Sequence, residues 1–425
     1  MYCRRYPRIK REIMDTSIII TIKQGKEKQL LRHHPWVFSG AIGTGPENQE
    51  TAQVVRVETF EGRFIAWGWY DRLSHIQLHL LSWEEQERID DAWWRQMFRK
   101  AILRRKRFFE DKNSATTCFR LIHGEADMLP GFAVDVYGTL VRIIVSARVA
   151  WDHLSLCIET IETLLHPSTV VMTTDTAFCG IEQLPETVQW YRQGQRFTPE
   201  QKLTPVRFRE NGIIYEIIPG KGQKSGFYCD QRDNRTEVAR FTRNAVVLDG
   251  CCYTGGFTLQ ALKAGAGQVD CFDSSDDALK QLLAHVHINQ NAGILPDGSR
   301  ERVSTTQGNI FELLRQIPQD HYDVMILDPP KLAQTKAQVE NATKAYKDMN
   351  RVAMEKIKDG GIIATFSCSG AVTREQFRMI LAWAAKDAGV ELQILQQLGQ
   401  GEDHPIRISF PESEYLKGFI VRVMK

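Results

Sequence analysis

The second half of the chain alternates short apolar runs with longer amphipathic stretches. Apolar runs of about four to eight residues between turn residues are typical of buried strands, and the stretches that follow them here have helical spacing. Regular alternation of this kind predicts a doubly wound α/β sheet over residues 219–425. The predicted strands are 245–249, 268–273, 302–306, 322–328, 361–366, 391–395 and 418–424, and the predicted helices include 276–289, 310–316 and 342–358.

Residues 17–90 have a different pattern, in which short apolar segments are separated by glycines. This spacing predicts a small all-β module. Its expected strands are 17–22, 53–57, 64–70 and 76–81.

Residues 91–218 mix both patterns and predict a central α+β domain. Residues 185–210 are rich in Gln, Arg and Pro and predict a surface loop. The other expected elements are helices at 91–109 and 151–165 and strands at 118–122, 133–137, 140–146, 169–174 and 213–218.

Composition excludes several classes of protein. The 425 residues are 43% hydrophobic and 25% charged, an ordinary globular balance. No apolar run approaches the roughly 18 residues that span a bilayer, so an integral membrane protein is excluded. Nine cysteines, an odd number without a C-x-x-C pair or a secretory signal, favour reduced thiols in the cytoplasm and no bound metal.

Basic residues are concentrated in one segment, although the net charge is only +2. Residues 94–112 hold eight basic and two acidic side chains interleaved with aromatic ones, which favours contacts with RNA phosphates by residues such as Arg104, Arg105 and Arg107. The alternative is a solvated helix face. Residues 1–16 predict a basic, disordered arm, or a start of translation at Met14.

Polar side chains follow four successive predicted strands. Asp249, Asp273, Asn309 and Asp328 stand at these strand ends, and ligands of such sheets bind outside the carboxyl ends of the strands. Glycines follow the first strand without the G-x-G-x-x-G spacing, and no P-loop is present, so a ligand with a ribose and an adenine but no phosphate fits best. S-adenosylmethionine meets this description. Each carboxylate alone is equally well explained as a helix N-cap.

Cys368 follows the fifth predicted strand and is flanked by Ser367, Ser369 and Gly370. A free cysteine is usually a small packed hydrophobe. This polar mouth beside the predicted pocket favours a nucleophile instead.

Several long motifs occur in order along the chain, and they resemble those of the bacterial large-subunit ribosomal RNA cytosine-C5 methyltransferases that carry an N-terminal PUA domain. The resemblance runs from about residue 17 to the C-terminus. Its motifs are RHHPWVFSG at 32–40, RLIHGEADMLPGFAVD at 120–135, GQKSGFYCDQRDNR at 222–235, DPPK at 328–331, SCS at 367–369, DHP at 403–405 and YLKG at 415–418.

The resemblance implies a PUA-like domain at 17–90, a basic helix and central domain at 91–218, and a Rossmann-like class I methyltransferase domain at 219–425 that binds S-adenosylmethionine. Asn309 stands where the family more often has Asp, which should weaken or retune cofactor binding. Residues 250–252 and 174–179 also depart from the family pattern, and the second departure puts an RNA contact there in doubt. The implied cofactor-binding residues are Gln223, Lys224, Asp249, Cys251, Tyr253, Thr254, Gly255, Gly256, Asp273, Ser274, Asn309 and Asp328.

The implied reaction is methylation of carbon 5 of a cytosine in ribosomal RNA. Cys368 would add to carbon 6 as the nucleophile, and Asp328 with Pro329, Pro330 and Lys331 would bind the base. Exposed β edges in the PUA-like module could pair two copies, so a homodimer stays open.

Two alternative functions stay open. One is methylation of a base nitrogen, such as guanine N7 or adenine N6, which needs no cysteine and often places an aromatic residue where Lys331 stands here. The other is an inactive RNA-binding homologue, which the Asn309 substitution leaves open. The presence of Cys368 together with Lys331 favours carbon 5.

Overall fold

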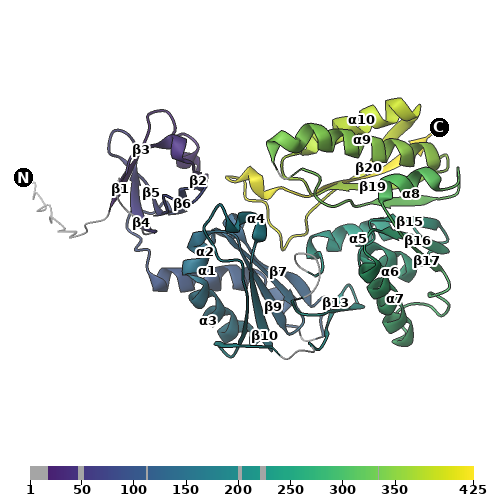
Figure 1. Ribbon diagram of the computed structural model, residues 1–425, viewed down its shortest axis with the longest axis horizontal. Helices are drawn as coiled ribbons and strands as arrows, with labels where there is room; N and C mark the ends of the chain where they lie inside the picture. The colour runs from purple at the N-terminus through teal and green to yellow at the C-terminus, as the bar shows by residue number, and fades with distance from the viewer. Residues whose placement is uncertain (1–17, 46–51, 112, 200–202, 221–225, 334) are drawn as a thin grey trace, which may run out of the picture.

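The computed structural model describes residues 18–45, 52–111, 113–199, 203–220, 226–333 and 335–425, arranged as three domains along the chain (Figure 1). The predicted arm at 1–16 and the predicted cofactor residues Gln223 and Lys224 lie outside the described residues. In the described part of the chain, no helix is both long enough and apolar enough to cross a membrane.

The N-terminal domain is a six-stranded sheet with the order β2-β6-β5-β4-β1-β3. Strands β1 and β4 alternate buried and less buried residues, and Val55 and Val57 of β4 are fully buried, whereas every residue of β6 is buried. The four predicted strands are confirmed, whereas two short strands of two or three residues were not predicted. The elements are β1 (Ile19–Ile22), η1 (Leu30–Arg32), β2 (Trp36–Val37), η2 (Ser39–Ala41), β3 (Ile42–Thr44), β4 (Gln53–Glu58), β5 (Phe64–Tyr70) and β6 (Leu78–Ser82).

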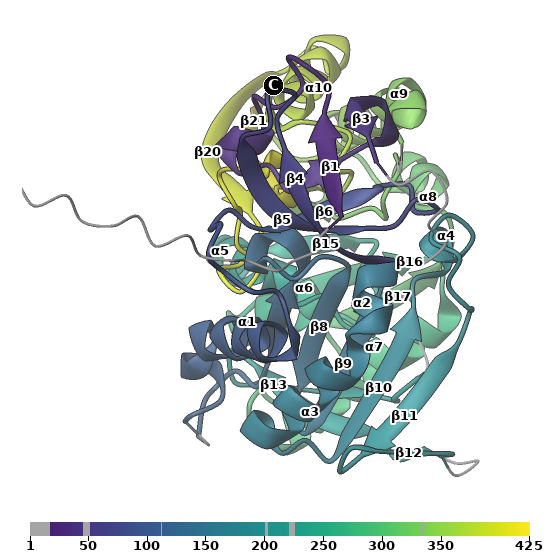
Figure 2. The ribbon, with the colours of Figure 1, turned by 90° about the vertical axis from the view of Figure 1, so that its left-hand side faces the viewer.

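The central domain is a six-stranded sheet with the order β12-β11-β10-β9-β8-β7, and its helices α1, α2 and α3 cover one face (Figure 2). Helix α1 buries Trp94, Phe98 and Ile102, which are four residues apart and therefore share one helix face, and turns its basic residues outward. The elements are α1 (Asp91–Arg104), η3 (Lys106–Phe108), β7 (Cys118–His123), η4 (Gly124–Asp127), β8 (Phe132–Tyr137), β9 (Leu140–Val145), α2 (Arg148–Asp152), α3 (Leu154–Leu165), β10 (Thr169–Thr174), α4 (Thr176–Cys179), β11 (Val188–Arg192) and β12 (Gln195–Phe197).

Three predictions in this region need correction. The surface loop predicted at 185–210 is wrong, because it contains β11, β12 and β13 (Val206–Glu210), which pairs with β14 (Ile213–Ile217). These strands bury few apolar side chains, among them Trp190 and Phe208, so their polar composition resembles that of a loop. The helix predicted at 91–109 ends at Arg104, and the helix predicted at 151–165 is interrupted at His153.

The C-terminal domain is a seven-stranded sheet with the order β17-β16-β15-β18-β19-β21-β20, which confirms the predicted doubly wound fold. Strands β15 to β19 pair in parallel, and β21 runs antiparallel to β19. The elements are η5 (Cys229–Gln231), α5 (Arg232–Ala239), β15 (Val246–Gly250), α6 (Gly256–Lys263), β16 (Gln268–Asp273), α7 (Asp276–Asn291), β17 (Val303–Gln307), α8 (Ile310–Gln316), β18 (Val324–Leu327), η6 (Lys336–Gln338), α9 (Val339–Lys356), β19 (Ile362–Ser367), α10 (Arg374–Ala388), β20 (Glu391–Gly399), η7 (Pro411–Ser413) and β21 (Lys417–Met424).

The segment between β20 and β21 extends out of the C-terminal domain and contacts the central domain (Figure 1). At its start, the carboxylate of Asp403 accepts hydrogen bonds from Arg232 Nη2 (3.0 Å) and from the backbone N–H of Arg120 (2.8 Å). The carbonyl of Asp403 accepts a third hydrogen bond, from Arg105 Nη2 (3.0 Å). Burial alone would raise the pKa of Asp403, but His404 and Arg232 outweigh it and lower this pKa, so the buried carboxylate stays charged.

The same segment also reaches the N-terminal domain. Arg407 donates hydrogen bonds to the carbonyls of Glu125 (3.0 Å) in the central domain and His33 (3.1 Å) in the N-terminal domain. Its guanidinium lies 5.3 Å from the centroid of the Trp83 ring, within the range of a cation–π contact. The segment between β20 and β21 therefore contacts all three domains.

We expect Asp403→Ala to lower the free energy of unfolding of the full chain by about 3–5 kcal/mol, because it removes the buried carboxylate partner of Arg232 and leaves only the exposed Asp233. Urea unfolding followed by tryptophan fluorescence measures this change. The neighbouring Glu402→Ala is the matched control, since Glu402 pairs with Arg107 at the surface and its loss should cost less than about 1 kcal/mol. Equal stability of the two variants would contradict the assigned role of Asp403.

Candidate functional site

Four neighbouring strands of the C-terminal sheet bring the predicted pocket residues to one edge. Strands β17, β16, β15 and β18 are adjacent and parallel, so their carboxyl ends lie side by side. The sheet order reverses at β15, which is the position where ligands of such sheets bind. The residues brought to this edge are Asp249, Asp273, Asn309 and Asp328.

The turn between β15 and α6 has an unusual backbone. Cys251, Tyr253 and Gly255 all have a positive φ, of 64°, 48° and 87° respectively. Two of them are not glycine, and such conformations persist only where the surroundings hold them. Asp273 supplies one such restraint, because its carboxylate accepts hydrogen bonds from the backbone N–H groups of Tyr253 (2.8 Å) and Ser275 (2.9 Å). This carboxylate thus joins the ends of β15 and β16 at the edge.

Two buried polar atoms beside this turn lack a partner. Asp249 is fully buried, and its Oδ2 accepts a hydrogen bond from Thr258 Oγ1 (2.6 Å). Among the described residues, neither Asp249 Oδ1 nor Thr254 Oγ1 has a hydrogen-bond partner. Burial raises the pKa of Asp249 to about 6, while the hydrogen bond from Thr258 opposes this rise. Orphaned acceptors of this kind fit a ligand that carries hydroxyl, amine or ammonium donors.

Three other predicted cofactor residues at this edge, Asn309, Ser274 and Cys251, are less buried than Asp249 and Thr254. Asn309 is exposed and caps α8, because its Oδ1 accepts a hydrogen bond from the N–H of Phe311 (3.0 Å). This is the N-cap role that the sequence left open for each polar strand-end residue. Ser274 is exposed, and the Cys251 thiol is half-buried with a pKa raised by burial.

Because Gly256 has no side chain, the buried Arg235–Glu210 ion pair can pack against the start of α6. A Cβ on Gly256 would lie 2.4 Å from Arg235 Nε, and Arg235 is held by two hydrogen bonds of 2.8 Å to the buried Glu210. A Cβ on Gly255 would lie 2.6 Å from Leu282. Close packing therefore requires these glycines independently of any ligand.

Cys368 lies at the end of β19, next to β18 and the DPPK segment. Its Sγ is 3.9 Å from the carbonyl oxygen of Pro329. Burial raises the pKa of this thiol to about 12, with further increases from the charges of Asp328 and Asp230 and an opposing effect of Lys331. The thiol is therefore protonated at neutral pH in the ligand-free protein.

Asp328 is half-buried beside this thiol. Burial raises its pKa to about 7, and the charge of Asp230 adds to the increase. A carboxyl with this pKa can donate a proton as well as accept one near neutral pH. Pro329 is buried, whereas Pro330 and Lys331 are exposed at the mouth of the segment.

Two charged residues near this corner were missed by the sequence reasoning. The charge of Asp230 raises the pKa of both Cys368 and Asp328, and its Oδ2 accepts a hydrogen bond from Tyr415 Oη (2.7 Å). Lys417 is only 1% exposed on β21. The signal for Lys417 was a single ammonium at the start of a run of strand-forming residues.

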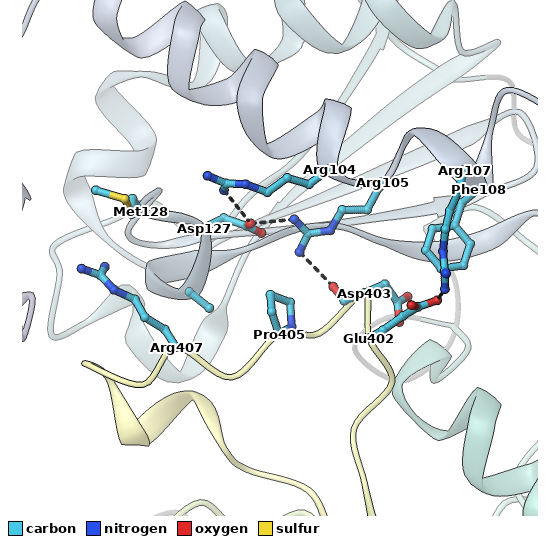
Figure 3. A pocket seen from close by; sticks show the side chains of 11 residues that line it. Arg104, Arg105, Arg107, Phe108, Asp127, Met128, Glu402, Asp403, Pro405 and Arg407 are labelled. Atoms are coloured by element: carbon cyan, nitrogen blue, oxygen red, sulfur yellow. Dashed lines mark hydrogen bonds and ion pairs between the residues drawn. The ribbon is translucent and has the colours of Figure 1, made fainter.

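The predicted basic residues line a cavity of about 400 Å³ between the central domain and the 402–407 segment (Figure 3). Arg105 is 3% exposed, pairs with Asp127 at 2.6 Å and donates to the carbonyl of Asp403, so it joins the central domain to the 402–407 segment, and its contact with RNA stays a prediction. Arg104 and Arg107 are exposed, with side chains 50% and 63% accessible, and they pair with Asp127 and Glu402. These two arginines remain available to solvent.

In the described part of the chain, no group of three His, Cys, Asp or Glu side chains could hold a metal ion.

Comparison with protein families gives two matches. Residues 20–83 match the PUA-like domain family, and residues 195–405 match the S-adenosylmethionine-dependent methyltransferase family. The predicted PUA-like domain, methyltransferase fold and cofactor, S-adenosylmethionine, are confirmed by these matches.

Similar proteins match along nearly the whole chain. The Ribosomal RNA large subunit methyltransferase I of Shewanella amazonensis is 36% identical over 96% of this chain and 100% of its own length. The protein with the same name from Escherichia coli is 33% identical over the same shares of both chains.

Solved structures show the same fold. A crystal structure determined in complex with SAH is 20% identical and covers 95% of this chain and 100% of its own, with a TM-score of 0.78. A structure from Streptococcus mutans is 19% identical with the same coverage and a TM-score of 0.77.

We expect Gly256→Ala to lower the free energy of unfolding by about 1–3 kcal/mol, because the new methyl group must displace the buried Arg235–Glu210 pair. Thermal unfolding without ligand measures this effect. Gly370→Ala is the matched control, since no heavy atom lies within 4 Å of the added Cβ. A Gly256→Ala variant as stable as this control would show that α6 can shift without cost.

Proposed function

Because the chain belongs to the family of Ribosomal RNA large subunit methyltransferase I, we propose that it methylates carbon 5 of a cytosine in large-subunit ribosomal RNA through a covalent adduct with Cys368. The observation that carries this proposal is the position of Cys368. Its thiol lies beside the Pro329 carbonyl and the Asp328 carboxyl, next to the strand ends that form the cofactor edge.

Carbon 5 of cytosine is a weak nucleophile, and the thiolate of Cys368 overcomes this by adding to carbon 6. The new sulfur–carbon bond pushes an electron pair toward carbon 5, which then forms a bond to the methyl group. S-adenosylmethionine, when bound, supplies that methyl group as an electrophile. A base then removes the proton from carbon 5, and the sulfur–carbon bond breaks to release Cys368.

Asp328 protonates or hydrogen-bonds ring nitrogen 3 in this scheme, which makes carbon 6 more electrophilic. Support comes from its pKa, which burial raises to about 7, so that a substantial protonated fraction exists near neutral pH. The carbonyls of Pro329 and Pro330 accept hydrogen bonds from the exocyclic amine, and Lys331 lies exposed at the same mouth. The base must leave its stack to reach this corner.

The orphaned acceptors Asp249 Oδ1 and Thr254 Oγ1 support a cofactor held at the β15 and β16 ends. We assign the same role to the remaining residues that the resemblance implies. They are Gln223, Lys224, Cys251, Tyr253, Gly255, Gly256, Asp273, Ser274, Asn309 and Asp328.

We expect Cys368→Ala to reduce methyl transfer to large-subunit ribosomal RNA by at least about 10³-fold, because the covalent route is lost. Labelled cofactor and nucleoside analysis of the product measure both the rate and the methylated position. Cys179→Ala is the matched control, since Cys179 is another half-buried thiol but lies on α4 of the central domain.

5-Methylcytidine made by the wild type and by Cys179→Ala, but not by Cys368→Ala, is the expected result. Label on a purine nitrogen, or full activity of Cys368→Ala, would replace the covalent mechanism with nitrogen methylation. Cofactor binding by the wild type without any transfer would instead support an inactive RNA-binding homologue.

We further expect the double variant Arg104→Ala/Arg107→Ala to bind RNA more weakly while its affinity for the cofactor is unchanged, because both arginines are exposed beside the basic cavity. The slope of log affinity against log salt should become shallower by about 0.7–0.9 for each phosphate that the variant no longer neutralises. Arg315→Ala/Arg378→Ala is the control, since these ion-paired, exposed arginines lie on α8 and α10. Unchanged RNA affinity would remove this face of α1 and η3 from the RNA footprint.

A further inference from the structure

Lys417 places an ammonium group in the interior of the methyltransferase domain. The residue is 1% exposed and begins β21, where it pairs in register with Ser367 of β19. Lysine is almost never fully buried without a partner, because removing its charge from water is costly. Its position therefore requires an explanation beyond packing.

The partners of this ammonium group are neutral. Lys417 Nζ donates hydrogen bonds to the carbonyl oxygens of Ser369 (2.7 Å) and Tyr415 (2.8 Å). Among the described residues, it forms no ion pair with a carboxylate. Burial lowers the pKa of Lys417 to about 8, and the nearby Cys368 opposes this change. The charge thus lacks a permanent counter-ion.

One of the two carbonyls that Lys417 contacts belongs to Ser369, the residue after Cys368. Ser369 is held in place, because its Oγ accepts a hydrogen bond from the N–H of Ala333 (3.0 Å) and lies 3.0 Å from Tyr346 Oη. These contacts fix the segment that carries the thiol, and the hydrogen bond from Lys417 together with the pairing of Ser367 and Lys417 joins it to β21. These hydrogen bonds therefore hold Lys417 next to Cys368.

The other charges around the thiol disfavour its ionisation. Asp328 and Asp230 are negative when ionised, and only Lys331, which is exposed to solvent, opposes them from the DPPK segment. A buried cation acts more strongly than an exposed one, since water screens it less. The titratable groups that act on Cys368 or Lys417 are Tyr228, Asp230, Asp328, Lys331, Tyr346, Arg374 and Glu414.

We propose that Lys417 is a positioning residue whose ammonium group stabilises the thiolate of Cys368. The thiolate in turn is the counter-ion that the ammonium group otherwise lacks. This inference rests on the proposed role of Cys368 as the nucleophile. Lys417 forms no covalent bond and keeps its proton, while the proton of the thiol passes to water. The role of the YLKG motif would then be to place the buried charge of Lys417 next to the SCS segment.

Alkylation of Cys368 by iodoacetamide tests this inference without methyl transfer, because the thiolate is the reacting form. Peptide mass spectrometry of the full chain measures the initial rates at Cys368 and Cys179 in the same sample. We expect Lys417→Met to slow alkylation of Cys368 at least tenfold at pH 7, whereas Cys179 on α4 reacts at the wild-type rate. Equal rates at Cys368 in both proteins would overturn the proposal.

The pH profile separates this role from a structural one. In the wild type, the alkylation rate of Cys368 should rise less steeply above about pH 8, where Lys417 loses its proton. Lys417→Arg keeps the charge at every accessible pH, so the change of slope near pH 8 should disappear. A change of slope that persists in Lys417→Arg would overturn the proposal, even if Lys417→Met fails to fold.

The outcome for Lys417 is independent of the outcome for the reaction. If Cys368→Ala retains full methyl transfer, the proposed function fails, yet the alkylation rates still report whether Lys417 stabilises the thiolate. Thermal unfolding and SAH titration of each variant identify the folded proteins to compare.

Discussion

The candidate site depends on one geometric constraint, which is that adjacent parallel strands end at the same edge of their sheet. In this protein the constraint brings four polar strand-end residues together although they are spread over 80 positions of the chain, from Asp249 to Asp328. The next parallel strand, β19, places Cys368 beside the last of them. The proposed cofactor edge and the proposed nucleophile thus become neighbours through strand order alone.

A second link joins this edge to the parts of the molecule proposed to hold RNA. The segment between β20 and β21 starts at Asp403 in the domain junction and passes Arg407, which contacts the N-terminal domain. It ends at Tyr415 and Lys417 beside the candidate pocket. A displacement of the N-terminal or central domain would therefore act on a segment that also contacts the candidate site.

The sequence predicted those elements whose local pattern of apolar and polar residues is distinctive. The central strands β15, β18 and β19 of the C-terminal sheet are buried on both faces, so their apolar runs were recognisable. The strands at 188–210 have mostly polar sequences and were mistaken for a loop, because their pairing is decided by neighbouring strands. Arg105 shows the same limit, since its charge suggested a contact with RNA but gave no sign of its contacts with Asp127 and Asp403, one of them almost 300 residues away. Asp230 and Lys417 were missed because their neighbours come from other strands.

The charges of the pocket face two opposing demands. Carboxylates suit a cofactor that carries ammonium and sulfonium groups, yet the same negative field raises the pKa of a thiol that must ionise. Separation in space reconciles these demands for Asp249 and Asp273, but not for Asp328, which lies beside the thiol. Asp249 and Asp273 lie at the β15 and β16 ends, whereas Lys417 lies on β21, on the other side of β19. Because electrostatic interactions in a poorly solvated site weaken with distance, each charge acts mainly on its nearer partner. Strand order would thereby determine which end of the pocket favours a cation and which favours a thiolate.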